Sequence, residues 1–488
     1  MIRKIQINLV KHFEEKIASY DKMELHYMAL KYYSHELNEV YMQKERYFSL
    51  RDLDEEIQQE FLQRTMKYRE ENRRNKYTAE YLIESNLYIA HSQAPLLITG
   101  DDFNYLLAFA DWLCALQEIS DICYQRPDDS FITVDEQFVI NIHRENEVIE
   151  DKYKQGIERK YAIKEYGLKF DEKDHEYVKK VKDAFIIDTG IDYELLLSLL
   201  EYICLDLILE TGIKEIDTNV YSFPIRAIID GFISGYEPGM FSDEAVKKTL
   251  DFIILNTSLL KTYGENKKSG VLPTWEREAR ENRFEVKPII INQESCVFSP
   301  VVIYQLWDLW RNGLLNWFPP YEIGLTNVKS VLEEWKKRYE DLMVQDIKKL
   351  FDDANFDQAI PEVELCSRFP QENFPEELGD YDVIAINEKK AEIWLIESKV
   401  FHKVGSIFED LMLQKSVFIQ HKYDEKFQKR IDYINNHIDR IVKVFGLQGT
   451  HYNVIPYMVT NKMFYSRYKL LSFEIISFSE LQSLLLDG

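Results

Sequence analysis

The sequence predicts a multidomain protein in which a mostly α-helical N-terminal region precedes an α/β C-terminal domain with a central mixed sheet flanked by helices. The chain has 488 residues, more than one compact hydrophobic core usually holds. Residues 1–90 contain no proline or glycine and are rich in Glu, Lys, Tyr and Leu, a composition typical of long helices. In the last third, short apolar runs of β-prone residues lie between helical patterns.

Breaks in these patterns divide the chain into three expected segments. Residues 1–263 form a mainly helical region that we expect to sense a signal, regulate or bind a partner. A polar stretch at 264–270 follows as a linker. Residues 271–326 form a connecting segment with a short strand and a helix, and two prolines at 319–320 end that helix. Residues 327–488 form the C-terminal domain.

The charge of the chain limits how it can bind nucleic acid. The formal net charge is −24, whereas proteins that coat nucleic acid without sequence preference usually carry the opposite sign. Any nucleic-acid binding must therefore use a local basic patch.

Cysteine usage and hydropathy indicate a cytoplasmic protein that does not enter a membrane. The five cysteines are scattered and form no CxxC pair, which argues against a disulfide framework or a zinc knuckle. The first residues lack an apolar run long enough for a signal peptide. The most apolar later stretch, 195–213, contains three acidic residues and is better explained as a buried helix than as a membrane span.

The C-terminal domain has a clear predicted order of elements. Apolar positions at helical spacing predict its helices, and apolar runs bounded by polar turns predict its strands. A capping box at Ser477 and Glu480 is expected to open a last short helix. The earlier elements are a helix at 328–351, strands at 359–366, 382–387 and 391–399, a helical region at 404–446, and strands at 452–460 and 470–476.

Three polar side chains are expected to converge on the second and third of these strands. Asp382 directly precedes a buried strand, and Glu397 and Lys399 lie two residues apart near the end of the next. Alternate residues of a strand share a face, so Glu397 and Lys399 point the same way, and a hairpin through 388–390 brings Asp382 close to them. The alternative interpretation, a buried ion pair, would be a poor stabiliser.

Two carboxylates and an ammonium suit metal-dependent hydrolysis. Carboxylates bind Mg²⁺ or Mn²⁺, and such an ion polarises a phosphodiester oxygen and makes a bound water more acidic. A lysine beside the ion can orient that water or offset the charge of the transition state.

The spacing of these residues resembles that of the PD-(D/E)xK nuclease superfamily, whose fold many restriction endonucleases share. The chain has Gly379-Asp380-Tyr381-Asp382, then fourteen residues, then Glu397-Ser398-Lys399. The resemblance covers about a third of the chain. It implies a restriction-endonuclease-like domain, an endonuclease that uses Mg²⁺ (or Mn²⁺), and Asp382, Glu397 and Lys399 as its catalytic residues. It also implies DNA rather than RNA as the favoured substrate, and a role in bacterial anti-phage defence or restriction.

A third metal ligand is expected from the first helix, where members of this superfamily often place an acidic residue. Glu340 is the best candidate because it lies about one helix length before the first strand, and Glu333 and Glu334 are rivals. Each could equally be a solvated helix carboxylate. Asp380 could replace Asp382, but it is also explained as a turn residue beside Gly379.

A basic stripe follows the third strand and is expected to contact the nucleic-acid backbone. The alternative interpretation is a solvated helix face, because acidic residues are interspersed with the basic ones. The candidate contacts are Lys403, Lys415, Lys422, Lys426, Lys429 and Arg430.

Three hypotheses for function remain open from the sequence. The leading one is a metal-dependent nuclease regulated by its helical N-terminal region. The second is a catalytically idle, nuclease-like scaffold or binding protein in a defence complex, which the acidic charge favours. The third is a toxin-like nuclease restrained by a protein partner or by homo-oligomerisation through the N-terminal helices. No P-loop, HExxH or GxSxG motif offers another chemistry.

Overall fold

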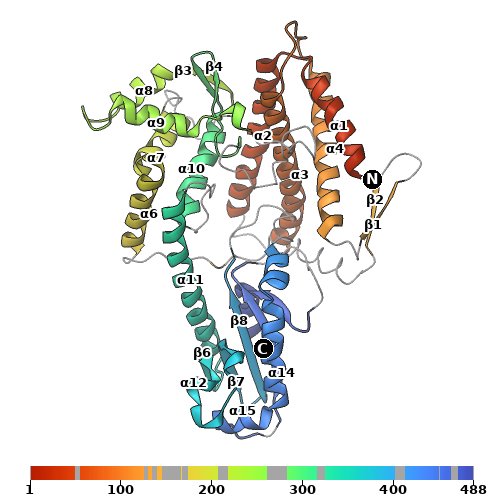
Figure 1. Cartoon of the computed structure of the whole chain (residues 1–488), viewed down its shortest axis with the longest axis vertical. Helices are drawn as coiled ribbons and strands as arrows, with labels where there is room; N and C mark the ends of the chain where they lie inside the picture. Colours follow the sequence, from red (N-terminus) through yellow and green to blue (C-terminus); the bar gives the residue numbers. More distant parts are fainter. Residues whose placement is uncertain are drawn as a thin grey trace. The chain divides into compact units, whose positions relative to one another are not determined.

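A computed structural model of the chain divides into two compact units (Figure 1). The N-terminal unit comprises Met1–Tyr124 and Lys173–Leu332, and the C-terminal unit comprises Gln125–Glu172 and Glu333–Gly488. The structure describes residues 2–49, 55–125, 130–134, 140–144, 166, 174–206, 218–260, 283–315, 325–401, 413–449, 451–462 and 471–486.

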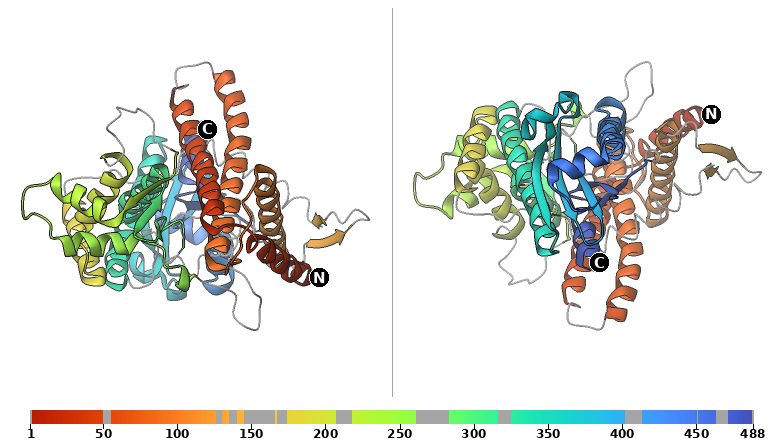
Figure 2. Two further views of the ribbon diagram at one scale, coloured as in Figure 1. Left: turned by 90° about the horizontal axis from the view of Figure 1, so that it is seen from above. Right: turned by 90° about the horizontal axis from the view of Figure 1, so that it is seen from below.

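The N-terminal unit is mainly helical, in agreement with the composition of its sequence. Its longest helices, α2 and α3, lie side by side (Figure 2). Their apolar faces, together with those of α1 and α4, form a core that includes Phe13, Leu30 and Leu82. The described helices of four or more residues are α1 (Ile2–Ile17), α2 (Lys22–Ser49), α3 (Glu55–Tyr88), α4 (Gly100–Gln125), α6 (Asp174–Thr189), α7 (Tyr193–Glu201), the π-helix η1 (Tyr202–Asp206), α8 (Ile225–Ser234), α9 (Asp243–Ile253) and α10 (Pro300–Leu315).

A small antiparallel sheet joins the predicted connecting segment to these helices. Strand β5 (Ser295–Phe298) lies between β3 (Tyr221–Pro224) and β4 (Ile290–Asn292). Val297 of β5 and Val301 of α10 belong to the same buried core as the N-terminal helices. The segment that the sequence set apart as 271–326 therefore falls within the N-terminal unit, because β5 pairs with a strand some seventy residues earlier.

The C-terminal unit is built on a mixed five-stranded sheet in the order β10-β9-β8-β7-β6. The pairs β6–β7 and β7–β8 are antiparallel, and β8–β9 and β9–β10 are parallel. The multidomain arrangement of a helical region followed by a mixed α/β sheet is thus as the sequence predicts. The strands are β6 (Gln358–Glu364), β7 (Asp380–Asn387), β8 (Glu392–Lys399), β9 (Asn453–Thr460) and β10 (Glu474–Ser477), and a separate hairpin pairs β1 (Ser130–Val134) with β2 (Ile140–Arg144).

Helices cover both faces of this sheet, and alternation along β8 shows which helix covers which face. Trp394 packs on Phe351 of α11 (Thr326–Asp353), with ring centroids 5.6 Å apart. Ile393 and Leu395 point to the other face, where they share a core with Phe427 and Ile441. These two residues belong to α14 (Tyr423–Asn436) and α15 (Ile438–Phe445). Glu397 and Lys399 therefore lie on the face that α14 covers.

The described residues differ from the predicted elements at three places, one of which is the last strand, predicted at 470–476 but beginning only at Glu474. The predicted helical region 404–446 begins at residues 404–412, which lie outside the described residues. Its apolar stripe at 425–446 predicts one helix, but α14 and α15 are separated at His437, whose φ of −126° is not helical. Asn435 and Asn436 precede the break and are weak helix formers. The first strand ends at Glu364, where the short helix α12 (Leu365–Arg368) begins.

The last helix, α16 (Phe478–Leu486), begins with the predicted capping box. The Ser477 hydroxyl accepts a hydrogen bond from the Glu480 N–H at 3.2 Å, and the Glu480 carboxylate accepts one from the Ser477 N–H at 2.7 Å. Two N–H groups at the helix start are thereby satisfied.

Tyr166 belongs to the C-terminal unit although it lies far upstream in the sequence. Its hydroxyl donates to Asp346 Oδ2 of α11 at 2.6 Å, and its N–H donates to the Asn461 carbonyl at 2.9 Å. Its ring packs on Tyr339 and Phe478, with centroids 5.2 and 4.6 Å away. Tyr166 thus connects α11, the end of β9 and α16.

Within the part of the chain that the structure describes, none of the helices combines the length and the apolar composition needed to cross a membrane.

A histidine buried in the N-terminal core is a point of pH sensitivity. His26 of α2 is fully buried, and neither of its ring nitrogens has a hydrogen-bond partner among the described residues. Burial, with a smaller contribution from the charge of Lys22, lowers the pKa of His26 to about 3. The folded protein therefore favours the neutral ring, whereas the unfolded chain takes up a proton near pH 6.5.

We predict that His26→Leu removes an acid sensitivity of the fold. The free energy of unfolding is highest when the His26 ring is neutral in both states, above pH 6.5. It falls as pH drops toward 3, because the unfolded chain binds a proton that the folded protein does not. Between pH 7 and pH 4 the native protein should lose about 3 kcal/mol that the variant does not lose. Denaturant unfolding at the two pH values measures this difference. His35→Leu, at an exposed position of the same helix, should keep the native pH dependence. Equal pH dependence in native protein and His26→Leu would contradict the prediction.

Candidate functional site

The register of the β7–β8 hairpin brings the predicted catalytic residues together. Val383 pairs with Ile396, and one further step along this antiparallel register places Asp382 opposite Glu397. Residues directly opposite one another in a sheet share a face, and Lys399 follows on the same face two residues later. The site therefore lies at the ends of two adjacent strands.

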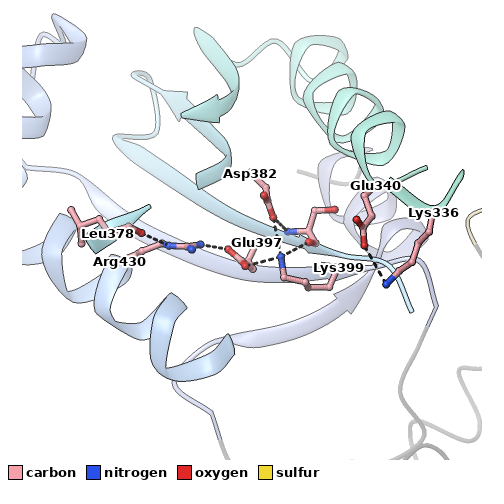
Figure 3. A network of polar contacts seen from close by, with 8 residues as sticks. Lys336, Glu340, Leu378, Asp382, Glu397, Lys399 and Arg430 are labelled. Atoms are coloured by element: carbon pink, nitrogen blue, oxygen red, sulfur yellow. Dashed lines mark hydrogen bonds and ion pairs between the residues drawn. The ribbon is translucent and has the colours of Figure 1, made fainter. Parts of the chain in front are cut away.

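Lys399 lies close to both carboxylates (Figure 3). Lys399 Nζ lies 2.8 Å from Glu397 Oε1 and 3.6 Å from Asp382 Oδ2. It also donates to the Ser398 carbonyl at 2.9 Å, and the Ser398 N–H donates to Asp382 Oδ2 at 2.5 Å. Glu397 is buried and Asp382 and Lys399 are partly buried, so these charges interact with little solvent between them.

This environment changes the proton affinity of two of the three groups. Burial raises the pKa of Asp382 to about 6; the Glu397 carboxylate adds to this rise, while Lys399 and the Ser398 N–H oppose it. Burial lowers the pKa of the Lys399 ammonium, but the charges of Glu397 and Asp382 outweigh burial and raise that pKa above its usual value. Lys399 therefore stays positively charged in this arrangement, and the raised pKa of Asp382 brings its titration close to neutral pH.

Arg430 of α14 completes the set of charges. Its guanidinium forms an ion pair with Glu397 Oε2, the oxygen that Lys399 leaves open, and its Nε donates to the Leu378 carbonyl at 2.8 Å. Gly379 has a φ of +64°, which an L residue rarely adopts, and this turn leads from Leu378 into β7. The sequence assigned Arg430 to a nucleic-acid contact, which stays a prediction; the structure shows it as a partner of Glu397.

Glu340 does not join the three residues in this structure. It lies on α11, which packs on the opposite face of the sheet, and it pairs with Lys336 at 3.5 Å (Figure 3). The described residues contain no group of three or more His, Cys, Asp or Glu side chains arranged to hold a metal ion. Asp382 and Glu397 remain as two carboxylates, and oxygen donors of this kind suit Mg²⁺ or Mn²⁺, which keep several waters as further ligands.

The predicted basic stripe is divided by the structure. Lys422, Lys426 and Lys429 are exposed at the start of α14 or along it, and Lys422 pairs with Glu425 at 3.4 Å. Lys415 is partly buried, and Lys403 lies outside the described residues. The exposed lysines stand on the helix that also supplies Arg430 to the site.

Two further residues hold the site in place, and sequence reasoning did not single them out. The buried amide of Asn461 accepts from the Phe401 N–H at 2.9 Å and donates to the Phe401 carbonyl at 3.0 Å, which fixes the chain just beyond Lys399. The ring of Tyr423 lies 5.3 Å from Lys399 Nζ. In the sequence, the position of Asn461 directly after the predicted strand 452–460 indicates that it lies at the same end of the sheet as Lys399.

Comparisons of the chain with protein-family models, with curated proteins and with solved structures find no match. Any assignment of function therefore depends on the geometry of the site and on the order of its elements.

We predict that Arg430→Ala destabilises the protein far more than the loss of an exposed ion pair. The variant leaves the buried Glu397 carboxylate with one cation fewer, which should lower the free energy of unfolding by about 3 kcal/mol. Lys443→Ala is the matched control, because it breaks a 3.1 Å pair with Glu372 in which the lysine side chain is 73% exposed. The control should cost less than about 1 kcal/mol. Urea unfolding compares the two, and similar costs would contradict the role given to Arg430.

Proposed function

We propose that the C-terminal unit is a metal-dependent nuclease of the PD-(D/E)xK type that hydrolyses phosphodiester bonds, with DNA favoured as its substrate. The observation that carries the proposal is the contact of Asp382, Glu397 and Lys399 at the ends of two adjacent strands. The order of elements adds support, because the helix α11, strands β6, β7 and β8, helix α14 and strand β9 follow the order of that superfamily's core.

Each residue has a distinct role in the proposed reaction. Asp382 and Glu397 would hold Mg²⁺ or Mn²⁺, which supplies a polarised phosphate oxygen and a more acidic water. Arg430 holds the Glu397 carboxylate in one orientation from the helix side. The raised pKa of Lys399 keeps its ammonium protonated, so it donates a hydrogen bond to the attacking water or to the developing charge on the phosphate.

The large helical N-terminal unit would regulate this activity or bind a partner. The unit accounts for most of the chain, and its sequence contains no P-loop, HExxH or GxSxG motif. On the resemblance to the nuclease superfamily we assign the whole protein to bacterial anti-phage defence or restriction.

Cleavage of plasmid DNA tests the proposal. With Mg²⁺ the native chain should nick or linearise the plasmid, and Lys399→Ala should lower the rate by about 100-fold or more, since it removes the ammonium proposed to act at the reacting phosphate. Lys389→Ala is the matched control, because Lys389 is an exposed lysine in the turn of the same hairpin, at its other end. The control should cleave at the native rate. Metal-dependent cleavage by Lys399→Ala at the native rate would refute the assignment.

One observation favours the second candidate function, a catalytically idle scaffold. Lys399 and Arg430 together neutralise both oxygens of Glu397, so the carboxylate is satisfied without a metal ion. In a purely structural ion-pair network the same contacts would suffice.

Calorimetric titration with Mn²⁺ discriminates the two candidates. A nuclease should bind Mn²⁺ with measurable heat, and Asp382→Asn, which keeps the size of the side chain but removes its charge, should weaken that binding at least about tenfold. A native chain that gives no binding heat, or an Asp382→Asn variant that binds as well as native protein, would favour the idle scaffold.

A further inference from the structure

Two aromatic rings stack on each other at the start of α14. The rings of His421 and Tyr423 have centroids 5.4 Å apart and planes inclined by 16°. Side chains two residues apart do not face each other in a helix. They do so here because Lys422, between them, has a φ of 52°, a left-handed conformation that residues other than glycine rarely adopt. Unusual backbone conformations of this kind concentrate at functional sites.

The stacked pair lies beside the catalytic centre. Lys399 Nζ is 5.3 Å from the centroid of the Tyr423 ring, and Lys426 Nζ is 5.5 Å from it. Tyr423 is partly buried, whereas His421 is exposed. A buried stack could serve packing alone, but an exposed ring backed by a second ring offers an apolar, planar face to a ligand.

The chemistry of this surface matches a nucleobase and its phosphate. Aromatic side chains beside a basic groove are how proteins bind single-stranded nucleic acid, and stacking is tolerant of sequence because every base has a flat face. Lys422 and Lys426 are exposed at the same place and can meet the adjoining phosphates. Within a duplex both faces of a base are covered by its neighbours, so this surface favours an unpaired base.

We propose that the His421–Tyr423 pair stacks an unpaired base next to the scissile phosphate, so that the site acts preferentially on single-stranded nucleic acid. This proposal rests on the proposed nuclease function and specifies its substrate class.

The chain contains a matched control at the other end of the same helix. Tyr433 and His437 also stack, with centroids 4.2 Å apart and planes inclined by 17°. Tyr433 lies ten residues beyond Tyr423 along α14, about 15 Å away at 1.5 Å per residue. The second pair has the same residue types, but among the described residues it makes no hydrogen bond, ion pair or ring contact with Asp382, Glu397 or Lys399.

Binding without metal tests the proposal independently of cleavage. Fluorescence anisotropy in EDTA would compare a labelled 20-nucleotide single strand, as oligo-dT or oligo-U, with a blunt duplex of equal length. At least one of the single strands should bind several-fold more tightly than the duplex. His421→Ala should weaken single-strand binding about tenfold and leave duplex binding unchanged. His437→Ala should change neither.

A conservative variant separates stacking from other roles of His421. His421→Phe keeps a flat ring and should restore single-strand binding to within about twofold of native, whereas a role through charge or hydrogen bonding would not be rescued. A duplex that binds as tightly as the single strands, or a His421→Phe variant as weak as His421→Ala, would overturn the proposal. Because His421 is exposed, circular dichroism should show both variants folded.

Cleavage then distinguishes this proposal from the function on which it rests. Absence of metal-dependent cleavage on every substrate would refute the nuclease itself, while aromatic-dependent binding of single strands would still stand. Metal-dependent cleavage of duplex and single strand at equal rates would leave the nuclease intact and refute the substrate preference.

Discussion

The C-terminal unit depends on a single electrostatic constraint, the burial of two carboxylates at one end of a sheet. The β7–β8 register sets Asp382 opposite Glu397, and like charges held so close in a poorly solvated place are unfavourable without compensation. Lys399 supplies one compensating cation from the same strand and Arg430 a second from α14. Under the proposed function, a divalent ion would take over part of this compensation.

Much of the neighbouring structure holds those two cations in place. Arg430 reaches Glu397 because α14 packs its apolar side, including Phe427 and Ile431, on the face of the sheet that bears the site. The positive φ of Gly379 directs the chain from Leu378 into β7, and the Leu378 carbonyl anchors the guanidinium. Beyond Lys399, the amide of Asn461 fixes the end of the strand. The site is thus held by the hairpin, by one helix and by the neighbouring strand.

The parts of this arrangement that are local in sequence could be predicted, and the parts that depend on distant packing could not. Glu397 and Lys399 share a face by strand alternation, and a short polar turn fixes which end of the hairpin holds Asp382. The pairing of Arg430 with Glu397 joins residues 33 apart through the packing of α14, and no local pattern encodes it. Likewise the apolar stripe of α14 continues into α15 across His437, so hydrophobic spacing conceals the break. The pairing of β3 with β5 depends on contacts between distant segments for the same reason.

Tyr166 has a consequence for how such a protein can be inherited. A domain that recombination moves between genes as one piece must be encoded in one uninterrupted stretch. Here the hydroxyl that bonds to Asp346 is encoded 180 residues upstream of its partner, with much of the helical unit encoded in between. A gene segment that began near residue 327 would leave behind the tyrosine that links α11, β9 and α16. A gene segment that keeps this tyrosine together with its partners must therefore span residues 166 to 478 and include the part of the helical unit encoded between them.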